Sequence, residues 1–263
     1  MPTLAPKLSI VISTHCRPKL LERALQSILN RSADDYEIIL CSDDGDKATF
    51  DVAFNHLRLC DTFLRIPFMK GPSESRNMGV SVARGDWICF LDDDDTFGEK
   101  YLQNVMNLIS NSKKKCVYFF NYQKIVESRE NGVIICIEKT VIDISKRDLN
   151  TLLVKNFIPI HAMIFPADFL SKHLFDCYLQ SHEDWDFVIS LLEAGAEFQW
   201  IENDCDAVRV HIDIAGVTRN NGNFVQLDYL SIYRKWPAKD DKIKRLRAKK
   251  FPRLGVKISK EAM

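Results

Sequence analysis

The chain has 263 residues, of which 46% are hydrophobic and 27% are charged, and this composition excludes a collagen-like, coiled-coil or disordered chain. The length suits one large α/β domain or two small ones, with a sizeable core. No apolar run approaches the roughly 18 residues that cross a membrane. The first apolar run, at residues 8–12, is shorter than the core of a signal peptide, and we therefore expect a cytoplasmic protein.

The net charge of zero conceals an acidic body and a basic tail. From Arg234 onward there are 12 Lys and Arg residues against 3 acids, whereas the preceding chain has 24 basic and 33 acidic residues. The acidic body argues against nucleic acid as a partner. The tail predicts contact with an anionic membrane surface, which would make the protein peripheral at the inner face of the cell membrane. A solvated terminal helix is the alternative.

The first 110 residues alternate between strand and helix patterns. Short apolar runs rich in β-branched residues predict buried strands at residues 8–14, 37–41, 62–66 and 86–91. Apolar residues at helical spacing predict helices at residues 18–31, 50–59, 75–83 and around 102–109. This alternation predicts a parallel sheet built from βαβ units.

The remainder of the chain is less regular. It predicts strands at residues 116–122 and 133–137, which we expect to pair, and further strands at 162–165, 198–201 and 207–211. Helices are predicted at residues 185–192 and 227–236, and a loop at 213–223. Because no linker or internal repeat interrupts the chain, we expect a single domain followed by the basic tail.

Three of the predicted parallel strands end in polar or acidic clusters. The clusters are Ser13 with Thr14, Asp43 with Asp44, and the four aspartates from Asp92 to Asp95. The carboxyl ends of parallel strands lie along one edge of a sheet, where open α/β sheets bind their ligands. We therefore expect the three clusters to line one site.

The run of four aspartates predicts a metal site. Adjacent carboxylates repel one another, and a divalent cation would relieve that repulsion while holding a diphosphate. Hard oxygen ligands suit Mn²⁺ or Mg²⁺. Residues two apart in an extended segment point the same way, so Asp92 and Asp94 can face one ligand. The alternative is a solvated turn that caps the following helix.

The other two clusters are suited to a nucleotide. A carboxylate of Asp43 or Asp44 can accept a hydrogen bond from the imide N–H of uracil, and Ser13 and Thr14 can bond the same nucleotide. A turn in which the aspartates bind local backbone amides is the alternative.

Arg76 stands at the start of a predicted helix, where its guanidinium can reach a base or a phosphate. The alternative is a surface arginine paired with an acid.

The segment from Ser181 to Trp185, with the sequence SHEDW, has two interpretations. Ser181 and Asp184 resemble a capping box. Asp184 can also face the cleft at a helix start and take a proton from an attacking hydroxyl. His211, at the end of a predicted strand, can complete a metal shell or touch a diphosphate, with a structural role as the alternative.

In the order of these motifs the chain resembles the family 2 glycosyltransferases of the GT-A fold, from Leu8 to about His211. LSIVISTHCRP resembles the first strand and loop of the family, EIILCSDDG its Asp-Asp-Gly strand, and GPSESRNMGVSVARGDWICFLDDDD its Ala-Arg-Asn-x-Gly helix with the D-x-D strand. HEDWDF resembles the Glu-Asp motif, and VRVHIDIAGVT the segment whose His closes over the diphosphate.

The resemblance implies a role for each matching residue. Asp44 is the acid that contacts the base, with Asp43 beside it. Asp92 and Asp94 carry the D-x-D role, Asp94 as the direct metal ligand, and Asp93 joins Asp92 at the nucleotide. Asp184 is the catalytic base, and His211 completes the metal site. His15, Cys16 and Ser13 depart from the family pattern Pro-Thr-Tyr-Asn but leave every expected carboxylate in place.

The implied protein has one GT-A domain at residues 1–222, with a nucleotide-binding half at 1–110 and an acceptor-binding half at 111–222, and a C-terminal helix with the basic tail at 223–263. It would transfer one sugar from a nucleotide-sugar, a UDP-sugar by expectation, to a saccharide or lipid-linked saccharide acceptor with inversion, using Mn²⁺ or Mg²⁺. Surface polysaccharide or glycolipid biosynthesis is the expected setting. Residues 156–161 and the loop 213–223 are expected to form the acceptor surface.

Two other functions remain as alternatives. One is a catalytically silent homologue that acts as a binding subunit, which the intact acids disfavour. The other is a sugar-nucleotide pyrophosphorylase, which the loop STHCRP disfavours because such enzymes look Gly-rich after their first strand.

Overall fold

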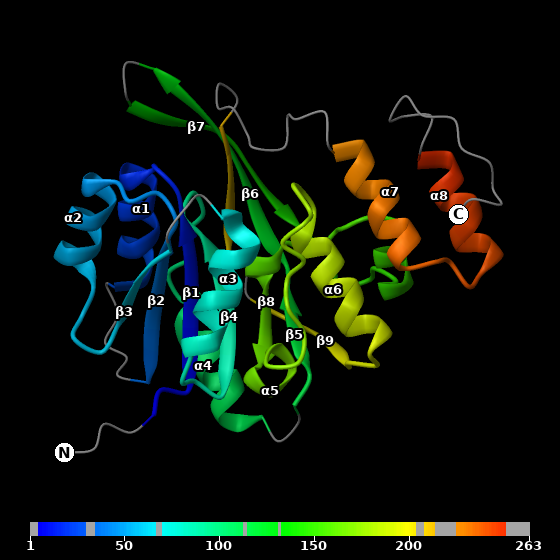
Figure 1. Cartoon of the computed structure of the whole chain (residues 1–263), viewed down its shortest axis with the longest axis horizontal. Helices are drawn as coiled ribbons and strands as arrows, with labels where there is room; N and C mark the ends of the chain where they lie inside the picture. The colour runs from blue at the N-terminus through cyan, green and yellow to red at the C-terminus, as the bar shows by residue number, and fades with distance from the viewer. Residues whose placement is uncertain are drawn as a thin grey trace.

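The computed structural model describes residues 5–29, 35–66, 70–112, 115–130, 133–203, 208–213 and 225–250. A seven-stranded sheet forms its centre (Figure 1). The strand order is β3 (Thr62–Arg65), β2 (Tyr36–Ser42), β1 (Leu8–Thr14), β4 (Trp87–Asp92), β8 (Met163–Pro166), β5 (Val117–Phe120) and β9 (Phe198–Ile201). Strands β1 to β4 are parallel, and β8 runs antiparallel to both of its neighbours. The sheet is therefore mainly parallel, as predicted.

Helices cover both faces of this sheet. On one face α1 (Pro18–Leu29), α2 (Lys47–His56) and α4 (Tyr101–Asn111) pack on alternate residues of β1 such as Ile10 and Ile12. On the other face α3 (Gly71–Val82) packs on the intervening residues, including Val11, and α6 (Glu183–Glu193) belongs to the same apolar layer, where the ring of Phe187 meets that of Phe165 on β8. Both faces of β1 are buried because the side chains of a strand alternate between two apolar layers.

Helix α3 lies very close to the sheet because residue 79 is a glycine. A Cβ atom added to Gly79 would lie 2.5 Å from Cγ1 of Val11 and 3.1 Å from Sγ of Cys41. The helix also begins earlier than its apolar spacing predicts, at Gly71, because Pro72 favours the first turn. Its start faces the carboxyl edge of the sheet, where the predicted clusters lie.

The second half departs from the predicted strand pairing. The predicted strand at 116–122 contains only β5, and a separate strand, β6 (Tyr122–Glu130), follows it. Strand β6, not β5, pairs with β7 (Val133–Ile142), and β10 (Arg209–Asp213) completes a second, three-stranded sheet. The predicted pairing of 116–122 with 133–137 is wrong because the charged, half-exposed β6 has no apolar run to reveal it.

Short helical turns connect these strands. They are η1 (Leu149–Leu153), η2 (Ile160–Ala162) and α5 (Ala167–Leu170). Helix α7 (Val225–Lys235) matches the helix predicted at 227–236. The predicted loop at 213–223 lies almost wholly outside the described residues.

The basic tail begins with a docked helix, α8 (Asp241–Lys250). Ile243 and Arg247 are buried against the body, and Arg247 Nε donates a hydrogen bond of 2.7 Å to the carbonyl of Leu153. The Arg247 guanidinium also lies 4.1 Å from the ring centroid of Tyr233. Residues after Lys250 lie outside the described part of the chain. Within the described residues, no helix combines the length and apolar character needed to cross a membrane.

Candidate active site

A cleft of about 810 Å³ opens at the carboxyl ends of β1, β2 and β4. The loop after β1, the first turns of α3 and α6, and β10 form its walls. The predicted site residues that line it are Ser13, Thr14, Asp43, Arg76, Asp92, Asp94, Asp184 and His211. Asp44 and Asp93 are not among its lining residues. Residues from distant parts of the sequence thus meet at one edge of the sheet.

The four aspartates point in different directions. Asp92 and Asp94 line the cleft, whereas Asp93 and Asp95 are buried beneath it. Asp94 Oδ2 accepts a hydrogen bond of 2.5 Å from Arg17 Nη1, and its side chain is 37% exposed. Asp93 also pairs with Arg17 and accepts a hydrogen bond from the hydroxyl of Thr14. Burial raises the pKa of Asp93 to about 6, despite the opposing effect of Arg17.

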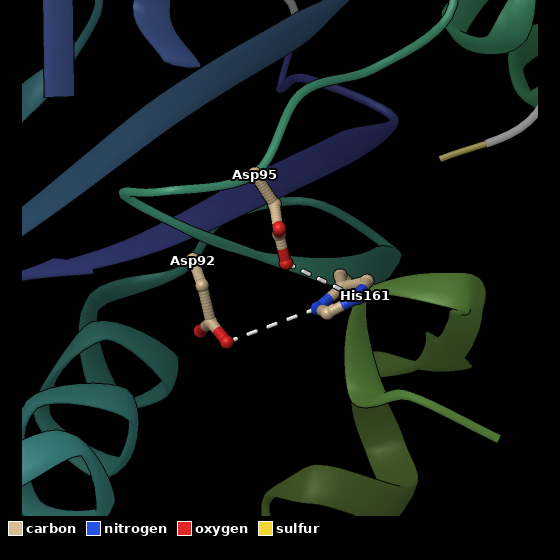
Figure 2. A group of neighbouring side chains, drawn as sticks. All are labelled: Asp92, Asp95 and His161. Atoms are coloured by element: carbon tan, nitrogen blue, oxygen red, sulfur yellow. Dashed lines mark ion pairs between the residues drawn. The ribbon is translucent and has the colours of Figure 1, made fainter. Parts of the chain in front are cut away.

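Figure 2 shows a group in which Asp92 and Asp95 converge on His161, a residue of η2. His161 Nε2 lies 3.3 Å from Asp95 Oδ2, and Nδ1 lies 3.8 Å from Asp92 Oδ2. Burial alone would lower the pKa of His161, but the carboxylates of Asp95 and Asp92 raise it to about 8. A proton on the ring therefore neutralises part of the charge of the two acids.

The same group has the donors for a divalent cation. Its ligand atoms all lie within 4.8 Å of one another, and it is the one such group of three found in the described part of the chain. His161 is 5% exposed, and both ring nitrogens lack a hydrogen bond of good geometry to the described residues. One imidazole nitrogen and two carboxylate oxygens are a donor set that several divalent metal ions accept. Sequence reasoning included His161 only in the expected acceptor surface, because no local pattern connects it to the aspartates.

Asp184 lies in the first turn of α6 and is half-buried at the cleft wall. Its Oδ2 accepts a hydrogen bond of 2.9 Å from Asn156 Nδ2, and its Oδ1 accepts one of 2.7 Å from the backbone N–H of Trp185. Burial, together with the neighbouring charge of Glu183, raises the pKa of Asp184 to about 7. The carboxyl group is therefore poised to exchange a proton near neutral pH.

The alternative of a capping box is not what the structure contains. The residue at the cap of α6 is His182, whose side chain makes no capping hydrogen bond. The hydroxyl of Ser181 instead donates a hydrogen bond of 2.7 Å to Asp228 Oδ2 on α7.

Arg76 connects the two sides of the cleft. Its Nη2 donates to Asp92 Oδ1 and its Nη1 to Glu183 Oε1, each at 2.8 Å. Arg76 is 4% exposed, so it is not the surface arginine of the alternative interpretation. The pairing with acids, which that alternative also predicted, is present. Burial opposes the charge of Arg76, and the carboxylates of Asp92 and Glu183 outweigh that effect and raise its pKa.

The two aspartates after β2 differ in their surroundings. Asp43 lines the cleft, where its Oδ1 lies 2.7 Å from His15 Nδ1 and its Oδ2 accepts a hydrogen bond of 2.7 Å from the N–H of Gly71. Asp44 accepts hydrogen bonds from its own loop and from the N–H of Cys16. Burial opposes its charge, but these bonds lower the pKa of Asp44. Contact between Asp44 and a base stays a prediction.

His211 reaches the cleft from β10. Its Nδ1 lies 2.6 Å from Glu127 Oε1, and its Nε2 lies 2.9 Å from the hydroxyl of Thr96. Arg23 pairs with the same Glu127 at 2.9 Å. Sequence reasoning missed Glu127 because it missed β6, and it missed Arg17 and Arg23 because they belong to no acidic motif. Whether His211 binds a metal stays a prediction.

The mainly parallel sheet, with an acidic cleft at its carboxyl edge, defines a GT-A-type α/β protein. Residues 9–174, more than half of the chain, match the model of the glycosyl transferase family 2. The chain therefore belongs to this family.

A segment of the chain is similar to a bacterial glucosyltransferase. A Campylobacter jejuni protein, GalNAc(5)-diNAcBac-PP-undecaprenol beta-1,3-glucosyltransferase, is 36% identical over 104 residues, which are 38% of this chain and 34% of that protein. The match therefore spans about a third of the length of that relative. Its activity is a property of the relative and does not by itself pass to this chain.

Two solved structures share the fold. Residues 1–349 of S. aureus TarS, in complex with UDP-GlcNAc, match with a TM-score of 0.68 and 16% identity, over 94% of this chain and 72% of that one. The mannosyltransferase PcManGT from Pyrobaculum calidifontis, in complex with GDP-Man and Mn²⁺, matches with a TM-score of 0.60 and 13% identity, over 94% and 69% of the two chains. At this identity the likeness establishes the fold, and the prediction of a GT-A fold is confirmed.

Proposed function

We propose that this protein is an inverting glycosyltransferase that moves one sugar from a UDP-sugar to an acceptor hydroxyl with the help of a divalent cation. The observation that carries the proposal is the position of Asp184. A carboxyl group with a pKa of about 7 shares one cleft with Asp92 and Asp94, the acids that follow a buried parallel strand. Membership of the glycosyl transferase family 2 supports the transferase class.

In the proposed reaction Asp184 acts as the general base. Its carboxylate takes the proton of the acceptor hydroxyl, and the hydroxyl oxygen forms a bond to the anomeric carbon. The bond between that carbon and the diphosphate oxygen breaks from the opposite side, which inverts the configuration. The hydrogen bond from Asn156 holds the carboxylate in place. A pKa near the working pH suits a base that must be ionised before it accepts a proton.

We consider two sets of residues for the divalent cation. Asp94 reaches the open cleft, and His211 lines the same cleft from β10. The second set is the buried group of Asp92, Asp95 and His161. We assign the ion that faces the diphosphate to Asp94 because a diphosphate can enter the open cleft, whereas His161 and Asp95 are buried below it. Bound Mn²⁺ or Mg²⁺ would offset the negative charge that develops on the leaving diphosphate.

The donor is assigned to the side of the cleft formed by β1 and β2. Ser13, Thr14 and Asp43 lie there, and a fold relative, TarS, has been crystallised with UDP-GlcNAc. Calorimetric titration of UDP in the presence of Mn²⁺ tests this assignment, with EDTA and GDP as controls. We expect metal-dependent binding of UDP and no binding of GDP. Equal binding with and without metal, or binding of GDP alone, would contradict the proposal.

The metal assignment is tested with two variants. We expect Asp94→Asn to remove the metal dependence of UDP binding, while His161→Asn leaves that dependence in place. The opposite result would assign the ion to the buried group. A silent homologue would bind UDP without consuming any UDP-sugar, so release of UDP from a panel of UDP-sugars separates that alternative from the proposal.

The acceptor is proposed to be a saccharide or lipid-linked saccharide used in surface polysaccharide or glycolipid synthesis. The relative from C. jejuni supports this choice, since its name includes an undecaprenol-linked substrate. An anionic membrane surface is the proposed partner of α8, where the exposed Lys242, Arg245 and Lys249 share one side of the helix.

Vesicle sedimentation tests the membrane proposal. We expect the protein to sediment with phosphatidylglycerol vesicles and not with phosphatidylcholine vesicles at low salt. Changing Lys242, Arg245 and Lys249 together to Glu should abolish this binding, whereas the same change at three exposed lysines of the body should not. The control lysines are Lys47, Lys146 and Lys172. Equal loss in both variants would contradict a specific role for α8.

A further inference from the structure

Helix α6 begins with an unusual backbone conformation. His182, immediately before the helix, has φ of +59°, in the left-handed region that residues other than glycine rarely adopt. Such a conformation persists only where the surroundings hold it. Two residues later stands Asp184, so the direction in which its carboxylate enters the cleft depends on this turn.

Asp228, on α7, binds the residue that precedes this turn. Its Oδ2 accepts two hydrogen bonds of 2.7 Å from Ser181, one from the backbone N–H and one from the hydroxyl. Both residues are buried, and Ser181 Oγ lies 2.8 Å from His182 Nδ1. A hydrogen bond between a charged acceptor and buried donors is stronger than a neutral one. The chain from Asp228 through Ser181 to His182 is therefore a fixed connection.

Aromatic rings of α7 complete the support. The ring of Tyr229 lies 4.7 Å from that of His182 and 4.8 Å from that of Trp185. Trp185 is fully buried and donates from Nε1 to the carbonyl of Leu152. His182 and Trp185 flank Glu183 and Asp184, so the first turn of α6 is held on both sides of the acid.

We propose that α7 positions the catalytic base, with Asp228 as the positioning residue that fixes the turn before Asp184. The inference rests on the proposed role of Asp184. Asp228 does not line the cleft, and it acts through Ser181 and His182. The region lies beyond residues 9–174, the part that matches the family model.

The test compares Asp228→Ala with Asp228→Asn. Alanine removes the acceptor of both hydrogen bonds, whereas an asparagine oxygen can still accept them. Small displacements of a reacting group can cost about 100-fold in rate, so we expect Asp228→Ala to lower kcat by about 10- to 100-fold. Asp228→Asn should restore most of that loss. The affinity for UDP with Mn²⁺ should stay within about twofold of the unaltered protein, because β1, β2 and β4 supply the nucleotide side.

Hydrogen exchange gives a readout that needs no acceptor. The backbone amides of Trp185 and Asp186, which donate to Asp184 Oδ1 and to the carbonyl of His182, should exchange faster in Asp228→Ala than in the unaltered protein and in Asp228→Asn. Ile232→Val, in the same buried cluster of α6 and α7, is the control for a general loss of stability. It should lower Tm and leave kcat and the exchange at Trp185 and Asp186 unchanged.

The outcomes separate the two proposals. Full turnover in Asp184→Asn would refute the proposed base and leave the exchange experiment to decide the role of Asp228. An inactive Asp184→Asn together with full turnover in Asp228→Ala would refute the positioning role alone. Unchanged exchange at Trp185 and Asp186 in Asp228→Ala would overturn it in either case. Equal losses in Asp228→Ala and Ile232→Val would also overturn it, because the effect would then follow stability.

Discussion

The two halves of the molecule build their shares of the cleft by different means. In the first half, β1, β2 and β4 each end at the same edge, and the residues that follow them enter the cleft directly. In the second half, Asp184 comes from a helix start, His211 from a strand of the second sheet, and Asn156 from a loop. Strand ends that share an edge position their residues by local geometry. The second half depends on contacts between distant segments, so substitutions there should act mainly on the placement of groups.

Among substitutions that test this difference between the halves, Asp184→Asn is expected to have the largest effect on the rate of transfer. An amide cannot take the proton of the acceptor, and removal of a general base typically costs about 100- to 10,000-fold in rate. We expect kcat to fall by such a factor while the affinity for UDP with Mn²⁺ changes by less than about threefold. Initial rates of sugar transfer and calorimetry measure the two effects. Turnover within a few-fold of the unaltered protein would rule out Asp184 as the base.

The second largest effect is expected for Arg76, which pairs with acids from both halves of the molecule. Arg76→Met would leave the carboxylates of Asp92 and Glu183 without their buried partner. Removing one member of a buried ion pair costs about 3–5 kcal/mol. We expect urea unfolding to report a loss of that order. Lys47→Met is the control, since Lys47 pairs with Asp51 on the exposed surface, and we expect a loss below about 1 kcal/mol. Similar losses in both variants would argue against a bridging role for Arg76.

A smaller effect is expected where α8 joins the second half. Arg247→Met removes the donor to the carbonyl of Leu153 and the contact with the ring of Tyr233. An unsatisfied buried carbonyl costs about 1–3 kcal/mol. We expect a lower Tm and faster proteolysis within α8. Arg245→Met, on the exposed side of the same helix, should change stability by no more than about 0.5 kcal/mol. Equal protease resistance of the two variants would contradict the docking of α8.

The dependence on pH tests Asp184 in the unaltered protein. Because the pKa of Asp184 is raised to about 7, its ionised fraction grows as the pH approaches and passes 7, and kcat/KM should rise with it and then level off. The same shift acts oppositely on stability. Between about pH 4 and pH 7 the folded state retains a proton that the unfolded chain has lost, so the contribution of Asp184 to the free energy of unfolding falls as the pH rises.

The unaltered protein and Asp184→Asn should therefore differ in the slope of stability against pH in that window. Urea unfolding at several pH values measures the slope. Parallel curves would mean that Asp184 titrates normally in the folded protein.

The comparison also explains what could be predicted. β1 was predicted with its observed bounds because it is a continuous apolar run between two layers of helices. The position of Asp92 and Asp94 at the cleft follows from the strand before them. His161 and Glu127 carry no such local signal. Their proximity to the aspartates and to His211 arises only when η2 and β6 pack in place.

The burial of Arg247 in the basic tail also could not be predicted from the sequence. Its net charge predicts a solvated or membrane-bound segment, yet Arg247 is buried because its guanidinium meets carbonyl groups and a ring rather than water. The net charge of the tail describes the exposed side of α8. The buried side is determined by contacts with η1 and α7, which the sequence of the tail does not show. Sequence patterns likewise could not separate Asp43 from Asp44, since only the folded loop shows which carboxylate is occupied by local hydrogen bonds.

Gly79 connects the packing of the sheet with the position of Arg76. It lies about one turn beyond Arg76 on α3, so the absence of its side chain determines how deeply the helix is seated on β1 and β2. The position of α3 on the sheet therefore determines whether the guanidinium of Arg76 can reach Glu183. The Cβ of an alanine at position 79 would push α3 away from the sheet, and Arg76 would then be displaced from Glu183. A single methyl group inside the sheet layer would thereby alter the position of acids in the cleft that it never touches.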